Sequence, residues 1–422
     1  MSGSRGEPLL VSSNHHSPLN KEELMTTATT RRTETSIAPA AKGTATLHVG
    51  LELSAREWKL AMSVGLGQAP RVRSVGAGNL ERLGRELGLA KERFGLPASA
   101  AVVSCYEAGR DGFWIHRALT QLGVVNYVVD SASIEVNRRA RRAKSDRLDA
   151  QRLLGLLLRY TQLAETTVWR VVRVPPEAVE DARHLHRELA ERKREQTRLS
   201  NQIRALLVLQ GVRYVALGRL RAAAVAQLVR WDGTRLPVGV AARVQRAVER
   251  WGAVRQEIRA LEGDLHARLR QPSAERGGLV ATAQHLARLR AIGASTAWVL
   301  SHEMFGWRAF ASSREVGGLS GLAPTPYHSG TSRHEQGISK AGNRWVRRLA
   351  SELGWNWVRW QPHSELSQWY QRRFAGGGSR LRRVGIIALA RKLLVALWRY
   401  VRTGVVPAGA CLKPALAREL AR

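Results

Sequence analysis

The chain has 422 residues, which is long for one ordinary domain and predicts two or three folding units. Its 67 Lys and Arg residues outnumber 34 Asp and Glu residues and give a formal net charge of +33. Nine of these cations are Lys and 58 are Arg, whose planar guanidinium can bind a phosphate through two hydrogen bonds. So large a charge would repel itself in a compact state unless anionic partners neutralised part of it. The excess of positive charge therefore argues against an enzyme that acts only on small molecules.

Membrane insertion and disulfide cross-linking are not expected either. The longest apolar segment, residues 385–398, is interrupted by Arg391 and Lys392, and no run reaches the length of a membrane span. Cys105 and Cys411 lie far apart and form no CxxC motif, which argues against a disulfide scaffold or a Cys-based zinc site. We therefore expect a cytoplasmic protein with a nucleic-acid partner and no membrane partner, associated with the nucleoid when it is bound to DNA.

The first part of the chain predicts a tail followed by an α/β domain. Residues 1–45 are rich in Ser, Thr, Asn and Gly and predict a disordered tail. From Thr46 onward the apolar pattern predicts strands at 46–54, 58–64, 71–75, 101–106, 124–129 and, less regularly, 169–174. Helices are predicted at 80–94, at 111–122 with Asp111 as a cap, and from residue 131 onward. Three adjacent strands followed by alternating helices and strands indicate a mixed sheet over residues 46–176.

The remainder of the chain is predicted to be mainly helical. Two apolar seams, Leu185–Leu206 and Val244–Leu265, predict an antiparallel coiled-coil arm over residues 177–270, which would serve dimerisation or spacing. Helices with Gly-rich loops resume over residues 284–402, and residues 403–422 form a basic tail. The start of the helical region resembles the hairpin of a helix-hairpin-helix, although an ordinary helix-loop-helix fits equally well.

Four acidic residues stand out against the basic background of the α/β region. Glu52 lies in the first predicted strand, on the face opposite its apolar neighbours, and Glu107 ends the fourth. Asp146 and Asp149 follow Ser145, a predicted N-cap, and would project from one face of a helix. Such carboxylates could converge on Mg²⁺, which takes hard oxygen ligands and serves phosphodiester cleavage and transfer. The two Asp residues could equally complement the helix dipole and pair with neighbouring Arg residues.

Basic residues surround these acids and fill the C-terminal end. No acidic residue occurs between Glu365 and Glu419, whereas eleven cations do. Five Trp residues between Trp345 and Trp369 lie among Arg residues, and those that are not core anchors can stack on unpaired bases. The candidate nucleic-acid-binding residues are Arg138, Arg139, Arg141, Arg142, Lys144, Lys340, Arg344, Arg372, Arg373, Arg380, Arg382 and Arg383.

Two blocks of motifs resemble those of a known family. The strand with Glu52 and the segments Tyr106–Gly112 and Lys144–Asp149 resemble the N-terminal domain of the DEDD transposases. This is the insertion-sequence family often called IS-one-ten, which includes the Piv-type invertases. The segments Gly318–Gly330 and Gly337–Asn343 resemble the family's C-terminal transposase domain. Both blocks occur in the family's order, on either side of the predicted coiled coil, and the resemblance covers nearly everything except the tail.

The resemblance implies a RuvC-like (RNase H-like) fold in which four acids bind Mg²⁺. The matching residues are Glu52, Glu107, Asp146 and Asp149. The family usually has Asp at the first of these positions, so Glu52 is a departure, and its longer side chain displaces the carboxylate.

The resemblance also implies a serine that joins DNA covalently. The matching residue is Ser329, between His328 and Gly330 in a stretch rich in Pro and Gly that predicts a loop. His328 is a candidate general base. Ser320, nine residues earlier, is the serine that could be mistaken for the nucleophile.

We therefore predict a DNA transposase or site-specific recombinase of an insertion sequence, which cuts and rejoins DNA with Mg²⁺ and a serine nucleophile. The resemblance further implies a homo-oligomer, a dimer or tetramer in which acids of one subunit meet the serine of another, and a guide RNA encoded by the element. Two alternatives stay open. One is an Mg²⁺-dependent DNA junction nuclease without a covalent intermediate. The other is a non-catalytic nucleic-acid-binding protein derived from a transposase, for which Glu52 would mark a degraded site.

Overall fold

The computed structural model describes most of the chain as two compact units, Met1–Val174 and Pro175–Arg422. The described residues are 45–134, 145–273, 277–329 and 332–413, and of residues 327–329 and 332–336 the backbone alone is described. Nearly all of the predicted N-terminal tail and residues 414–422 of the basic tail lie outside these ranges. No helix within them is long and apolar enough to cross a membrane.

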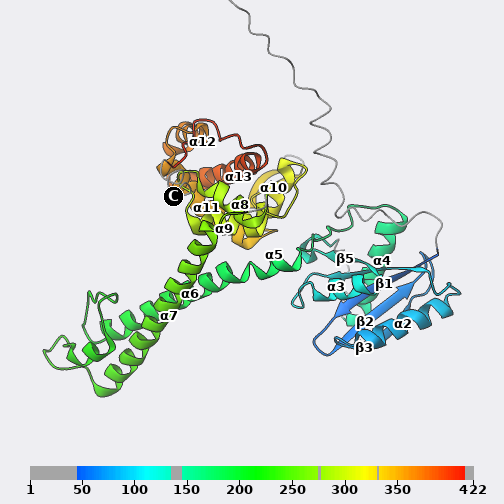
Figure 1. Cartoon of the computed structure of the whole chain (residues 1–422), viewed down its shortest axis with the longest axis horizontal. Coiled ribbons are helices and arrows are strands. Elements are labelled where there is room, and N and C mark those ends of the chain that lie inside the picture. Colours follow the sequence, from blue (N-terminus) through cyan, green and yellow to red (C-terminus); the bar gives the residue numbers. More distant parts are fainter. Residues whose placement is uncertain (1–44, 135–144, 274–276, 330–331, 414–422) are drawn as a thin grey trace, which may run out of the picture. The chain divides into compact units, whose positions relative to one another are not determined.

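Five strands form one mixed sheet in the first unit (Figure 1). Their order across the sheet is β3-β2-β1-β4-β5, and β1 pairs antiparallel with β2 and parallel with β4. The strands are β1 (Thr46–Leu53), β2 (Glu57–Ser63), β3 (Arg71–Gly76), β4 (Ala101–Glu107) and β5 (Val125–Val129). The predicted mixed α/β class is confirmed, and the sheet is compatible with an RNase H-like fold.

Helices cover both faces of this sheet. On one face, α2 (Leu80–Arg93) and α3 (Trp114–Gln121) share a core with the apolar side chains of β1. On the other face, α4 (Asp146–Gln162) packs Leu153 with Cys105 of β4. Because side chains alternate between the two faces of a strand, the central strands contribute to both cores.

The helix α4 approaches the sheet at Gly50, where no side chain can be accommodated. A Cβ atom on Gly50 would lie 2.5 Å from the carbonyl oxygen of Ala150 and 2.5 Å from the amide nitrogen of Leu154. At the other end of α4, the Gln162 side-chain amide donates to the carbonyl oxygen of Val64, 3.1 Å away. Val64 follows the end of β2 that pairs with the start of β1. The first turn of α4 therefore lies at the carboxyl end of β1.

Three predicted elements of this unit differ from the structure. The helix predicted from Asp111 begins at Trp114 and has Phe113 at its N-cap, because Gly112 turns the chain with a φ of 68°. Asp111 is therefore not the cap. The helix predicted from residue 131 is a single 3-10 turn, η1 (Ser131–Ser133), ahead of α4. The strand predicted at 169–174 is reduced to an isolated bridge to β5, since two prolines follow and cannot donate to a ladder.

Two long helices, α6 (His184–Val208) and α7 (Val238–Arg270), pack along each other in the second unit. The short α5 (Glu177–Asp181) precedes them, and η2 (Ala222–Gln227) lies in their connection. Ion pairs join Glu195 to Arg250 at 2.7 Å and Arg192 to Glu257 at 3.2 Å. The earlier residue of α6 pairs with the later residue of α7, so the two helices are antiparallel (Figure 1). The coiled-coil geometry of the predicted arm stays a prediction.

The rest of the second unit is helical except for one hairpin, whose strands are β6 and β7. Its elements are α8 (Leu279–Ala287), α9 (Ala294–Leu300), η3 (Ser301–Phe305), α10 (Ser313–Ser320), β6 (Pro324–Ser329), β7 (Ser332–Ile338), α11 (Arg344–Trp360), α12 (Glu365–Tyr370), η4 (Gln371–Ala375) and α13 (Ser379–Thr403). The largest apolar core joins α8, α9, α11 and α13 around Trp357 and Leu393. The turn between α8 and α9 fits both a helix-hairpin-helix and an ordinary helix-loop-helix over residues 284–293.

Substitution of Gly50 by Ala should destabilise the first unit, because the new methyl group meets two backbone atoms of α4. We expect a loss of about 1–3 kcal/mol in the free energy of unfolding, measured by urea denaturation. Gly88→Ala is the matched control, since a Cβ atom at that exposed position of α2 meets nothing within 4 Å. The control should be neutral or slightly stabilising. Equal stability of Gly50→Ala and the wild type would contradict the close approach of α4.

Candidate active site

Glu52 and Glu107 lie at the carboxyl ends of two neighbouring parallel strands. Gly50 and Cys105 are paired in the register of β1 and β4, so the register continued by two residues sets Glu52 beside Glu107. Gly50 faces α4, and the Cys105 thiol lies 3.6 Å from the carbonyl oxygen of Leu153 in α4. Because strand side chains alternate, residues two positions on lie on the same face. Both Glu residues therefore belong to the face of the sheet that α4 covers.

Asp146 and Asp149 occupy the first turn of α4, at the same edge of the sheet. The predicted N-cap is confirmed, since the Ser145 hydroxyl oxygen accepts a hydrogen bond from the amide of Leu148 at 3.4 Å. Residues four apart share a face of a helix. Asp146 is thus aligned with Ala150, which contacts β1, and Asp149 is aligned with Leu153, which contacts β4.

The four acids consist of oxygen donors alone, a set that suits Mg²⁺ chemically. Among the residues that the structure describes, however, no group of three or more His, Cys, Asp and Glu side chains lies close enough to hold a metal ion. Cys105 adds no ligand, because burial raises the pKa of its thiol and keeps it protonated. The backbone therefore brings four carboxylates to one edge of the sheet without gathering them into a finished metal site.

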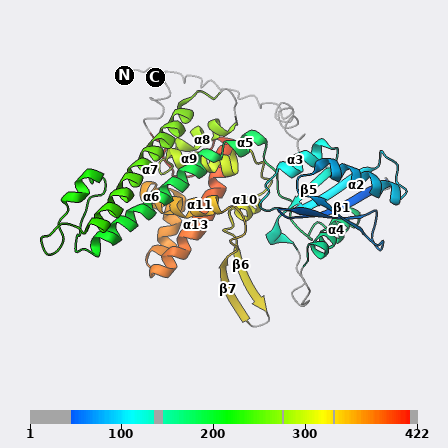
Figure 2. The same ribbon diagram turned by 90° about the horizontal axis from the view of Figure 1, so that it is seen from below.

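The backbone of Ser329 ends the strand β6, at the tip of the hairpin that projects from the second unit (Figure 2). Ser329 pairs with Ser332 of β7, and the strands carry an irregularity between Pro324 and Pro326. The prediction of a loop was therefore wrong for this segment. Proline and glycine indicated a turn, but a bulge lets a strand tolerate proline where a regular ladder would not.

Ser320 has a structural role that removes it from consideration as the nucleophile. Its side chain is buried, and its hydroxyl donates to the carbonyl oxygen of Gly317 at 2.8 Å. Gly321 follows in the left-handed conformation, with a φ of 66°, and ends α10. A Cβ atom there would collide with the carbonyl oxygen of Ala341, so the two ends of the hairpin are held in backbone contact.

A buried carboxylate, Glu303, joins three separate segments of the second unit. The side chain of His186 lies 2.9 Å from its carboxylate, and Arg187 donates to it at 3.0 Å. Asn343 donates from its side-chain amide at 2.8 Å. The same Asn343 caps α11 by accepting hydrogen bonds from two backbone amides, so Glu303 fixes the start of the helix that follows the hairpin.

The charge of Glu303 is retained despite complete burial. Desolvation raises its pKa, but the hydrogen bond from His186 and the charge of Arg187 more than offset this and lower the pKa from 4.5 to about 2. The stabilisation is therefore fully present above pH 4.5 and is lost as the pH falls toward 2. Sequence reasoning missed this residue, and the available signal was a single acid within the apolar stretch from Trp298 to Phe305.

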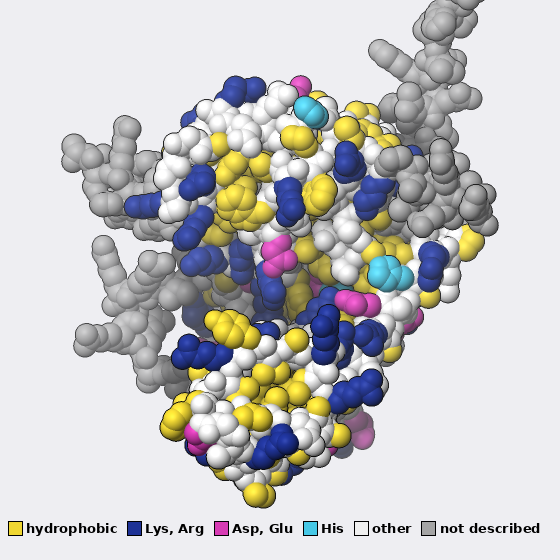
Figure 3. Space-filling model, turned by 90° about the vertical axis from the view of Figure 1, so that its left-hand side faces the viewer, with side chains coloured by type: hydrophobic (Ala, Val, Ile, Leu, Met, Phe, Trp, Pro, Cys, Tyr) yellow, Lys and Arg dark blue, Asp and Glu magenta, His cyan; other side chains and the backbone are white. Residues whose placement is uncertain are grey.

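The predicted nucleic-acid-binding residues divide into two groups. Those of the second unit are exposed, and on the face drawn in Figure 3 Lys and Arg side chains are widely spread while Asp and Glu side chains are few. These exposed residues are Lys340, Arg344, Arg372, Arg373, Arg380, Arg382 and Arg383. The other group lies outside the described residues and consists of Arg138, Arg139, Arg141, Arg142 and Lys144.

Comparison with known proteins identifies the family. A family model described as "Transposase IS116/IS110/IS902 family" matches residues 283–370. A protein of Sinorhizobium fredii (strain NBRC 101917 / NGR234), "Putative transposase y4rJ", is 39% identical over 378 residues, which make up 87% of this chain and 94% of that protein. The transposase for insertion sequence element IS1328 of Yersinia enterocolitica is 27% identical over 227 residues, or 53% of this chain and 63% of that protein.

These similarities define the class as transposases, enzymes that cut and rejoin DNA. The chain belongs to the IS116/IS110/IS902 transposase family. The resemblance inferred from the sequence motifs is thereby confirmed.

Replacing Glu303 by Gln should destabilise the second unit by about 3 kcal/mol, because Arg187 would lose its buried counter-charge. Urea unfolding at neutral pH measures this loss. Glu352→Gln is the control, since Glu352 is exposed and forms an ion pair with Arg348 one turn earlier in α11. That control should lose no more than about 0.5 kcal/mol. A Glu303→Gln variant as stable as the control would show that the buried carboxylate does not stabilise the unit.

Proposed function

We propose that this transposase cleaves and rejoins DNA through a transient covalent bond to Ser329, with Mg²⁺ held by Glu52, Glu107, Asp146 and Asp149. The observation that carries the proposal is the common position of the four acids at the carboxyl edge of β1 and β4. Glu52 supplies the same carboxylate donor group as the Asp usual in the family, on a longer side chain.

The chemical step is an exchange of phosphate esters. The Ser329 hydroxyl loses its proton as its oxygen attacks a backbone phosphorus. The bond from phosphorus to the leaving deoxyribose oxygen breaks, and that oxygen takes up a proton. Bound Mg²⁺ would stabilise the negative charge that develops on the phosphate oxygens. Rejoining reverses the exchange when the hydroxyl of another strand displaces the serine, so no external energy source is required.

The partners beyond DNA are part of the same proposal. A guide RNA encoded by the element would pair with donor and target DNA, and the surplus of Arg suits a second polyanion. A dimer or tetramer would supply acids and serine from different subunits. The protein would act in the cytoplasm, on the nucleoid.

Ser329→Ala should abolish the covalent protein–DNA adduct while leaving DNA binding unchanged. The adduct is detected as labelled DNA that migrates with the protein on a denaturing gel, after incubation of the full chain with DNA spanning the element's ends and RNA from the host. Binding is measured by mobility shift. Ser332→Ala is the matched control, because Ser332 pairs with Ser329 across the hairpin. An adduct that survives Ser329→Ala would exclude the assignment, and cut ends without any wild-type adduct would favour a junction nuclease.

Asp149→Asn and removal of divalent metal with EDTA should each stop strand cleavage in the same assay. The first removes a ligand charge and the second removes the ion, so both should leave DNA binding in place. Glu81→Gln is the control, since Glu81 is exposed in the first turn of α2, within the same unit. Full cleavage by Asp149→Asn, or in the presence of EDTA, would contradict the proposed metal site.

A further inference from the structure

The helix α13 has a second apolar face that the core covers only in part. Its buried face includes Ala390, Leu393 and Leu397, which join the large apolar core. Val384 is 54% exposed on another face, and the partly buried Ile387 and Val395 continue that row at helical spacing. A helix that is apolar on more than one side normally has a partner on each side.

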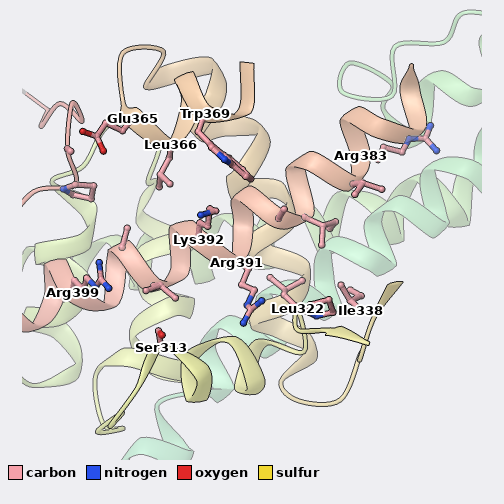
Figure 4. Close-up of a pocket in the computed structure, with 18 of the residues that line it drawn as sticks. Ser313, Leu322, Ile338, Glu365, Leu366, Trp369, Arg383, Arg391, Lys392 and Arg399 are labelled. Carbon is pink, nitrogen blue, oxygen red and sulfur yellow. The ribbon is translucent and has the colours of Figure 1, made fainter. Parts of the chain in front are cut away.

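This second face forms the floor of a groove with a volume of about 1350 Å³ (Figure 4). Leu366 and Trp369 of α12 line one side. Leu322 and Ile338, at the base of the β6–β7 hairpin, line the other. The groove thus lies within the second unit and reaches the base of the hairpin that carries Ser329.

Five cations border the apolar floor, and one acid, Glu365, lines the same groove. The cations are Arg380, Arg383, Arg391, Lys392 and Arg399. None of the five forms an ion pair with a carboxylate among the residues that the structure describes. The groove therefore offers uncompensated positive charge beside an apolar surface.

Two of these cations are held in position by their neighbours. The Arg391 guanidinium lies against α10 at Gly317, where a Cβ atom would come within 2.9 Å of its Nε atom. The Lys392 ammonium lies 4.9 Å from the ring centre of Trp369. Arg383 and Arg399 lie toward opposite ends of α13 in Figure 4, so positive charge borders the whole length of the floor.

We propose that this groove binds an unpaired DNA strand, with bases on the apolar floor and phosphates on the bordering cations. A role for that strand at the cleavage site rests on the proposed function of Ser329. Binding of the strand in the groove does not depend on it. An unpaired strand exposes both its phosphates and its base faces, and single-strand sites combine a cationic groove with surfaces that receive bases.

The alternatives match the groove less well. Duplex DNA presents its phosphates but keeps its base faces stacked inside, which would leave the apolar floor facing water. A second copy of the chain would need an acidic surface to match the five cations, whereas its Lys and Arg residues outnumber its Asp and Glu residues by 67 to 34. Charge and apolar surface together therefore favour a single strand.

The charge arm of the test uses two double variants with the same change in net charge. Arg383→Gln with Arg399→Gln removes two groove cations of α13, and Arg359→Gln with Arg402→Gln removes two exposed cations outside the groove lining, one on α11 and one on α13. Fluorescence anisotropy of the full chain with a short labelled single-stranded DNA measures affinity over a range of salt concentrations. We expect the groove variant to bind roughly tenfold more weakly, with a salt slope smaller by about 1.4 for two lost phosphate contacts. The outer variant should change affinity less than about twofold.

The apolar arm of the test compares Val384→Asn with Leu381→Asn. Both residues are exposed apolar side chains of α13, at 54% and 45% exposure, but Val384 alone of the two lines the groove. Val384→Asn should weaken single-strand binding several-fold and leave the affinity for a duplex of the same sequence unchanged. Leu381→Asn should change neither. Thermal unfolding confirms that the variants fold.

Four results would overturn the proposal. The first two are an equal loss of single-strand affinity in the groove and outer variants, and a loss of duplex affinity in the groove variants that equals or exceeds their loss of single-strand affinity. The other two are a loss of affinity in the groove variants for single-stranded RNA alone, and a changed oligomeric state of Val384→Asn with unchanged binding of single-stranded DNA. Failure of the proposed function is distinguishable, because it appears as a missing Ser329 adduct while the groove variants still lose single-strand affinity.

Discussion

The contact between α4 and Gly50 determines where the acids of this transposase lie. Without a side chain at Gly50, the helix backbone rests directly on β1, and its first turn reaches the carboxyl edge of the central strands. Glu52 and Glu107 end those strands at the same level, because β1 and β4 are parallel and in register. Close packing of one helix on one strand thus aligns residues almost a hundred positions apart in the sequence.

The second unit contains one buried charge that is paired and a group of cations that are not paired with carboxylates among the described residues. Glu303 is completely buried, and its charge is stabilised by Arg187 and by hydrogen bonds with His186 and Asn343, so it contributes to the stability of the unit. Within the described ranges, the five cations of α13 that border the groove form no ion pair with a carboxylate, which costs stability in the absence of a ligand. Sites that bind polyanions commonly retain such uncompensated charge, because binding a ligand then relieves the repulsion.

Local sequence patterns predicted the strands and the start of α4 well, because the alternation of apolar and polar residues and the N-cap at Ser145 are short-range signals. The same patterns misread the stretch around Ser329, where Pro and Gly indicated a loop and the structure has the strand β6 of a hairpin with a bulge. Glu52, Glu107, Asp146 and Asp149 stood out as acids against a basic background and matched the family's motifs, but their common edge depends on register that a sequence does not reveal. Glu303 was missed because its partner His186 is 117 residues away. The groove was missed for the same reason, since its walls come from α12, α13 and the hairpin.

The Glu303 cluster also limits which parts of this chain can be exchanged by recombination. Arg187 and His186 belong to the first long helix of the arm, while Glu303 and Asn343 belong to the region matched by the family model. A gene exchange that replaced the arm alone, with an arm lacking these partners, would leave a carboxylate buried without counter-charge. Such a hybrid would be strongly destabilised. The arm and the C-terminal region are therefore expected to be inherited as one block, even where the α/β unit is exchanged.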